Sequence, residues 1–79
     1  MAQKKRTIKC GIGDKRFTVV EVQGDRYSGR SFEDAMDAAM PDRGNLVKVY
    51  AVCAPDIASA RMGFARSQLI RTFRFRRNG

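Results

Sequence analysis

The sequence contains no histidine and only two cysteines among its 79 residues. Without histidine the chain lacks the most common general base and the most common nitrogen ligand for metals. Neither cysteine lies in a recognisable nucleophile motif, so a cysteine or serine nucleophile would need an unusual base. The sequence therefore predicts a protein that is not an enzyme and that has no cofactor and no metal site.

Long apolar runs are also missing. No stretch approaches the roughly 18 residues that a membrane-spanning helix needs. The basic residues 1–6 are not followed by the apolar segment of a secretory signal. We therefore expect a cytoplasmic protein that does not bind membranes. In that compartment Cys10 and Cys53 would be reduced thiols, buried as small hydrophobic side chains.

Phosphate-binding and acidic motifs are equally sparse. The segment Gly11-Ile12-Gly13 lacks the third glycine and the following helix of a dinucleotide-binding motif, so we interpret it as a hairpin turn. Three acidic residues cluster at 33–37, within an expected helix. Solvation and the favourable field at a helix N-terminus explain Glu33, Asp34 and Asp37 better than a metal or acid–base pair does.

Alternating apolar residues predict strands in the first third of the chain. Residues 7–12 alternate strictly, and residues 17–22 are rich in β-branched side chains. A Gly-Asp turn separates the two segments, which favours a hairpin. A third short strand is expected at residues 26–30.

A helix is predicted to begin at Ser31, whose side chain can cap it, and to end before Pro41. Its apolar residues recur at helical spacing and form one continuous face. These residues are Phe32, Ala35, Met36, Ala39 and Met40.

The C-terminal half repeats the order of strand and helix. Residues 46–53 form the most apolar strand, interrupted only by Lys48, which is typical of a central strand. A second helix is predicted over residues 57–66, followed by a final strand over residues 69–76. The alternative is a helix that continues to about Arg71.

These elements predict a single α+β domain over residues 7–79, preceded by a flexible basic arm at residues 1–6. The expected architecture is a two-layer sandwich. It consists of a mixed, mainly antiparallel sheet of four to five strands, with two helices on one face. The predicted core comprises Ile8, Cys10, Ile12, Val20, Val22, Phe32, Met36, Met40, Val47, Val49, Ala51, Ile57, Phe64 and Phe73.

Charge is distributed unevenly along the chain. The formal net charge is +8, divided into +5 over residues 1–16, −3 over residues 17–45 and +6 over residues 46–79. Two basic ends and a mildly acidic middle indicate a polarised molecule. Such a field favours polyanions or acidic protein surfaces as partners.

The basic residues of the C-terminal third, apart from Lys48, are all arginines, whose guanidinium groups suit phosphate and carboxylate contacts. In an extended final strand, Leu69, Arg71, Phe73 and Phe75 would share one face, and Ile70, Thr72, Arg74 and Arg76 the other. Arg74 and Arg76 would then lie about 7 Å apart. The alternative interpretation is a solvated edge strand whose charges prevent aggregation. The predicted binding surface comprises Arg71, Arg74, Arg76, Arg77, Arg61, Arg66, Lys15, Arg16, Lys9 and Tyr50.

The hairpin, the helix Ser-Phe-Glu-Asp-Ala-Met-Asp-Ala-Ala at residues 31–39 and the return strand broadly resemble small phage-encoded inhibitors of anti-CRISPR type. The resemblance covers roughly residues 7–53 and rests on architecture and size. It implies a protein that docks stoichiometrically on a Cas protein or surveillance complex in the host cytoplasm, without chemistry of its own. Many such inhibitors are acidic, whereas this chain is basic, so an acidic protein patch or the nucleic acid of the complex fits better than DNA mimicry.

Two functions follow as hypotheses. The first is docking through an arginine-rich surface on nucleic acid or a nucleoprotein complex, mostly through the phosphate backbone. The alternative is inhibition of an anti-CRISPR type, through binding to an acidic surface of the target.

Overall fold

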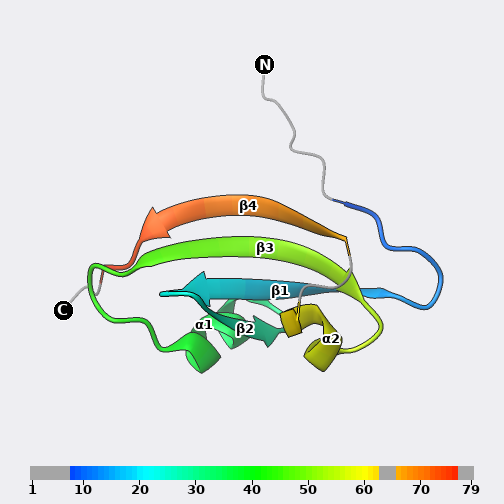
Figure 1. Cartoon of the computed structure of the whole chain (residues 1–79), viewed down its shortest axis with the longest axis horizontal. Coiled ribbons are helices and arrows are strands. Elements are labelled where there is room, and N and C mark those ends of the chain that lie inside the picture. The colour runs from blue at the N-terminus through cyan, green and yellow to red at the C-terminus, as the bar shows by residue number, and fades with distance from the viewer. Residues whose placement is uncertain (1–7, 63–65, 77–79) are drawn as a thin grey trace, which may run out of the picture.

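A computed structural model describes residues 8–62 and 66–76. Four strands form one sheet in the order β2-β1-β3-β4, and all three pairings are antiparallel (Figure 1). This arrangement confirms the predicted α+β class and a strand, not a helix, at the C-terminal end. The elements are β1 (Lys15–Val22), β2 (Asp25–Gly29), α1 (Phe32–Ala39), β3 (Leu46–Ala54), α2 (Ile57–Met62) and β4 (Ser67–Arg74).

A two-residue turn joins β1 to β2. Gln23 and Gly24 both have positive φ angles, 51° and 86°, and the pair Val22–Asp25 closes the hairpin. Turns of this handedness match the natural twist of a hairpin, and glycine adopts the second position without steric cost. The turn therefore fixes the register of β2 against β1.

Helix α1 forms as the sequence predicts. The Ser31 side chain accepts a hydrogen bond from the backbone N–H of Asp34 at 3.1 Å, and Met40 ends the helix in the left-handed region. The helix packs closely on β2 at Gly29. A Cβ atom at that position would lie 2.6 Å from the backbone nitrogen of Ala35, so only glycine allows this approach.

The strand register divides the core into two clusters, because successive side chains of a strand point to opposite faces. On the face that α2 covers, called here the α2 face, Phe17 and Val19 pack with Val52 and Ala54. On the opposite face, called the α1 face, the residues in contact are Val20, Val22, Ala35, Val47 and Val49.

The two helices therefore cover opposite faces of the sheet, and the prediction that they share one face is wrong. In Figure 1, α2 lies in front of the sheet and β2 passes in front of α1. The physical reason is that β1 and β3 have apolar side chains on both faces of the sheet. Val19 and Val20 are adjacent and both fully buried, which requires a cover on each face.

The N-terminal segment differs most from expectation. Residues 8–14 form no strand, and Ile12 is fully exposed at the end of a turn. A disulfide joins Cys10 to Cys53, with a Cα–Cα distance of 5.3 Å, so the prediction of two reduced thiols is wrong. Two hydrogen bonds, from Ile8 N to Gln68 Oε1 and from Arg66 Nη1 to the Lys9 carbonyl, hold the same segment. The segment is therefore held by a disulfide and two hydrogen bonds, and it is not a paired strand.

The core is partly as predicted. The buried residues that were expected are Val20, Val22, Val47, Val49 and Ala51, whereas Ile8, Cys10, Met36 and Phe73 are half-buried. The predicted core residues that are exposed instead are Ile12, Phe32, Met40 and Ile57. The buried residues of the α2 face that were not predicted are Phe17, Val19, Val52, Ala54 and Ala60. Phe64 and the arm at residues 1–6 lie outside the described residues.

Candidate nucleic-acid interface

Strand β4 lies at one edge of the sheet and contains a bulge. Its register pairs Val49 with Arg71 and Tyr50 with Leu69, which leaves Ile70 without a partner residue on β3. The extra residue reverses the alternation of side chains on its N-terminal side. Leu69 therefore shares the α2 face with Arg74, and the predicted grouping of Leu69 with Arg71 is wrong. Phe73 and Phe75 do pack against the α1-face cluster, as expected.

Only part of the α2 face is covered. Helix α2 has six residues, and its buried Ala60 packs over the beginning of β1 and the end of β3. The rest of this face has no helix over it in the described chain. We call this region the open half-face; its charged, polar and aromatic residues are Glu21, Arg26, Lys48, Tyr50, Thr72 and Arg74, and the exposed Leu46 and Leu69 lie on it beside Arg74 and Tyr50.

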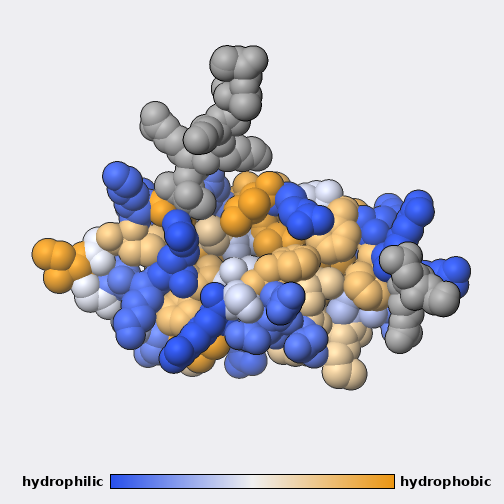
Figure 2. Space-filling view, turned by 180° about the vertical axis from the view of Figure 1, so that it is seen from behind, coloured by the Kyte–Doolittle hydropathy of each residue, from blue (hydrophilic) through white to orange (hydrophobic). Residues whose placement is uncertain are grey.

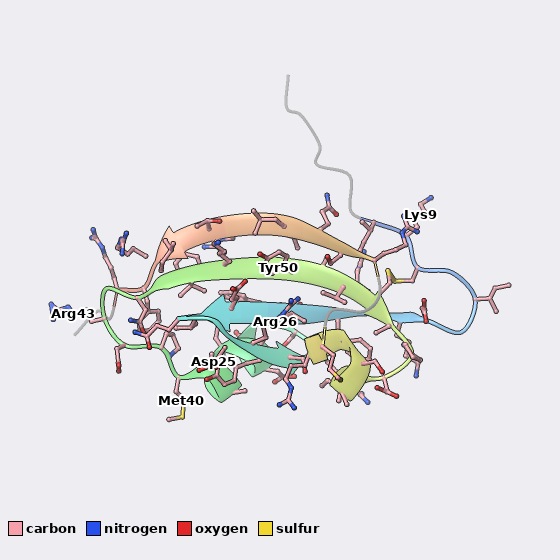
Figure 3. All side chains as sticks on the ribbon, viewed as in Figure 1. Lys9, Asp25, Arg26, Met40, Arg43 and Tyr50 are labelled. Carbon is pink, nitrogen blue, oxygen red and sulfur yellow. A yellow bond between two sulfur atoms is a disulfide. The ribbon has the colours of Figure 1, made fainter. Side chains whose placement is uncertain are left out.

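An arginine–tyrosine pair lies at the centre of the open half-face. The guanidinium carbon of Arg26 lies 5.5 Å from the centre of the Tyr50 ring, and Figure 3 shows the Arg26 side chain directed across β1 towards β3. The Tyr50 hydroxyl donates a hydrogen bond of 3.3 Å to Glu21 Oε1. The Nε atom of Arg26 is buried and has no hydrogen-bond acceptor among the described residues. Stacking on the Tyr50 ring thus orients the guanidinium group of Arg26, which has no carboxylate partner among the described residues.

Two further cations lie beside this pair, on β3 and β4. Lys48 is half-buried, whereas Arg74 is exposed and donates a hydrogen bond of 3.0 Å to the Gly44 carbonyl. Together they line an open cleft of about 370 Å³ between the 44–46 loop and the β1–β2 turn. The loop is fixed in place by backbone hydrogen bonds in both directions between residues 44–45 and Phe75. The cleft therefore lies at one end of the sheet, with a fixed loop as one wall and two cationic side chains in its lining.

Arg71 belongs to a different surface. It lies on the α1 face, where its guanidinium carbon is 4.7 Å from the Phe73 ring centre and 5.4 Å from that of Phe32. The two phenylalanine rings are themselves 6.3 Å apart. Figure 2 shows this side of the molecule, where apolar surface occupies the middle and hydrophilic side chains gather towards the ends. Arg71 thus cannot act together with Arg74 on one flat ligand.

The other predicted site residues lie elsewhere. Lys9 is at the opposite end of the molecule from Arg43 in Figure 3, and Arg66 is engaged by the Lys9 carbonyl. Lys15 and Arg16 line a second cleft, of about 440 Å³, at the start of β1. Arg61 is exposed on α2. β4 ends at Arg74, so Arg76 does not continue the strand, and Arg77 lies outside the described residues.

Of the ten predicted residues, the open half-face brings together Tyr50 and Arg74 only. Arg26 and Lys48 were missed as binding residues. Lys48 could have been predicted from the sequence, because it is the one charged residue of an apolar strand and lies two residues from Tyr50, on the same face. Arg26 carried none, since its position over Tyr50 depends on the register of β2 against β1 and of β1 against β3.

Among residues 8–62 and 66–76, no group of three or more His, Cys, Asp or Glu side chains could hold a metal ion. Within those ranges, no helix is long and apolar enough to cross a membrane.

The fold and the open half-face define a small α+β domain with a cationic, partly uncovered sheet surface. Comparison with known proteins finds no matching family model, no significantly similar curated protein and no significantly similar solved structure.

Proposed function

We propose that this protein is a small non-enzymatic binding protein that docks on nucleic acid, or on the nucleic acid of a nucleoprotein complex, through the open half-face. The observation that carries the proposal is the arrangement of Arg26, Lys48 and Arg74 around Tyr50. The only carboxylate of this surface, Glu21, accepts a hydrogen bond from the tyrosine hydroxyl. The cations therefore dominate the charge that this face presents.

Chemistry and charge distribution both support a polyanion as the ligand. Guanidinium and ammonium groups contact phosphate oxygens directly, and such contacts position a nucleic acid without reading its sequence. The acidic residues Glu33, Asp34 and Asp37 belong to α1, on the opposite side of the sheet. This separation produces a field that orients an approaching polyanion towards the open half-face.

The test removes two charges from the open half-face and the same number from elsewhere. The Lys48→Ala/Arg74→Ala variant is compared with the matched control Arg61→Ala/Arg71→Ala, using labelled oligonucleotides and fluorescence anisotropy over a series of salt concentrations. We expect the first variant to lose roughly tenfold or more in affinity at low salt, and its salt slope to fall by about two. The control should lose far less. Equal losses in the two variants would show that only net charge matters, and would overturn the assignment of the surface.

An acidic protein patch is the other polyanionic partner, and the one expected from the resemblance to anti-CRISPR-type inhibitors. A pull-down with and without nuclease separates the two. Nucleic-acid docking predicts that retained partners are released by nuclease. A partner that survives nuclease but is lost with the Lys48→Ala/Arg74→Ala variant would contradict the proposal and favour the protein-directed hypothesis.

A further inference from the structure

We infer that the ligand of the open half-face is a single-stranded nucleic acid with one base stacked on the Arg26–Tyr50 pair. This inference rests on the proposed function and specifies its ligand. It is drawn from the shape of the surface, from the state of the two stacked side chains, and from the lack, among the described residues, of a basic helix longer than six residues.

The first argument concerns what could enter a duplex groove. Reading a duplex by its base edges requires a helix or a protruding ribbon in the major groove. Helix α1 exposes Glu33, Asp34 and Asp37, which would be repelled by phosphates, and α2 is only six residues long. An uncovered sheet face, by contrast, admits bases that are already unstacked.

The second argument concerns Tyr50 itself. It is half-buried and packs against the α2-face core cluster, and its hydroxyl donates a hydrogen bond to Glu21, so both ends of the side chain are held. The side chain belongs to β3, a central strand of the sheet. A rigid aromatic ring at the middle of an open sheet is the arrangement on which single-stranded nucleic acids stack their bases.

The third argument concerns Arg26. Its guanidinium group already lies over the Tyr50 ring, and its buried Nε atom has no acceptor within the described chain. Bases stack on guanidinium planes as well as on aromatic rings. Arg26 and Tyr50 together therefore form one stacking platform. Lys48 lies two residues from Tyr50 on the same face of β3, about 7 Å along the strand, where it can contact the phosphate of the stacked nucleotide.

The principal experiment uses the absence of tryptophan from the sequence. A Tyr50→Trp variant places a single tryptophan fluorophore at the platform, and it is titrated with an unstructured oligothymidine strand and with a duplex of equal length. We expect strong quenching by the single strand and little by the duplex. Unchanged emission while anisotropy reports saturated single-strand binding would overturn the inference and leave the proposed function standing.

Removal of the ring gives the second measurement. Tyr50→Leu should weaken binding of the single strand about tenfold or more, with a change of no more than about twofold for the duplex. The matched control is Tyr27→Leu, because Tyr27 pairs with Val20 and so lies on the α1 face. Equal losses for single strand and duplex, or an equal loss in the control, would contradict the inference.

Folding and function are controlled separately. If Tyr50→Leu unfolds, NMR of the wild-type protein with the single strand tests the stacking instead. A base stacked on Tyr50 must shift its ring protons upfield more than those of Tyr27. If the wild-type protein binds no nucleic acid at low salt, the proposed function fails together with the inference. If binding depends on Lys48 and Arg74 but not on the Tyr50 ring, only the inference fails.

Discussion

The two faces of the sheet are built differently. On the α1 face, the capped helix α1 packs on β1 and β2, and Phe73 and Phe75 pack against the same core cluster. The α2 face is closed at one end by a six-residue helix and is open at the other. The difference originates in β1 and β3, where Glu21 and Lys48 replace apolar residues on one face only.

This contrast separates stability from recognition. Helix α1, Phe73 and Phe75 pack on the α1 face, whereas the charged and aromatic groups that we propose for ligand binding lie on the other. Substitutions on the open half-face are therefore expected to affect binding with little effect on folding. The following predictions test the contrast, in order of decreasing effect.

The largest effect is expected from loss of the disulfide. Cys10 and Cys53 are separated by 43 residues in sequence, and closing a loop of that length restricts the unfolded chain by about 4 kcal/mol in the chain-entropy estimate. Cys10→Ala should therefore lower the free energy of unfolding, measured with urea, by about that amount.

Reduction provides the control for this prediction. Wild-type protein in dithiothreitol should approach the stability of Cys10→Ala, and the variant itself should not respond to dithiothreitol. An equal free energy of unfolding of the wild type with and without reductant would show that the disulfide does not stabilise the fold.

A matched pair of neighbouring residues tests whether each face has a true core. Val19 packs on the α2 face and Val20 on the α1 face, and both are fully buried. Truncation removes two buried carbons and leaves a cavity, so each Val→Ala change should cost about 2 kcal/mol by urea unfolding. A clearly smaller loss for Val19→Ala would mean that the short helix α2 encloses no well-packed core.

The smallest effect is expected at the start of α2. Asp56 accepts a hydrogen bond of 2.8 Å from the Ser59 backbone N–H, and that bond, with help from the Ser59 hydroxyl, lowers the pKa of Asp56 below its ordinary value of 3.8. A carboxylate with a lowered pKa stabilises the folded state above its unfolded pKa, and this contribution is lost as pH falls through the folded value.

Asp56→Ala should therefore lower the melting temperature slightly at neutral pH, and the difference from wild type should shrink below about pH 3.8. Thermal unfolding followed by circular dichroism over a pH series measures this difference. A difference that stays constant through the acidic range would mean that the Asp56 carboxylate does not cap α2.

Much of the fold could be predicted from local patterns. The Ser31 cap, the apolar spacing of α1 and the β-branched residues of β1 and β3 each specify their own element. The placement of the helices could not be predicted in the same way. It depends on the apolar residues of both parities in β1, and the neighbours Val19 and Val20 are the visible sign of two buried faces.

The strand predicted for the N-terminal segment is absent from the described residues for a physical reason. Ile8, Cys10 and Ile12 alternate as in a strand, but β1 already has β2 on one side and β3 on the other, so pairing with it would displace one of them. The disulfide joins two cysteines that are 43 residues apart in sequence, and the fold brings them together. Two cysteines without a disulfide-rich spacing pattern gave no signal in favour of oxidation over reduced thiols.

The candidate site shows the same limit. Tyr50 and Arg74 could be named from residue type, whereas their neighbours Arg26 and Lys48 follow only from the pairing of four strands. The bulge at Ile70 is a further example. One extra residue assigns Arg71 and Leu69 to opposite faces, and no local signal in the sequence announces it.

The link between Cys10 and Cys53 also gives the chain a covalent shape: a ring that carries a tail. The ring contains β1, β2, α1 and most of β3, and the tail contains α2 and β4. Of the four strands in the described chain, β4 alone lies wholly outside the ring. The strand that carries Arg74 on the open half-face is therefore joined to the covalent ring by its pairing with β3 and not by the disulfide.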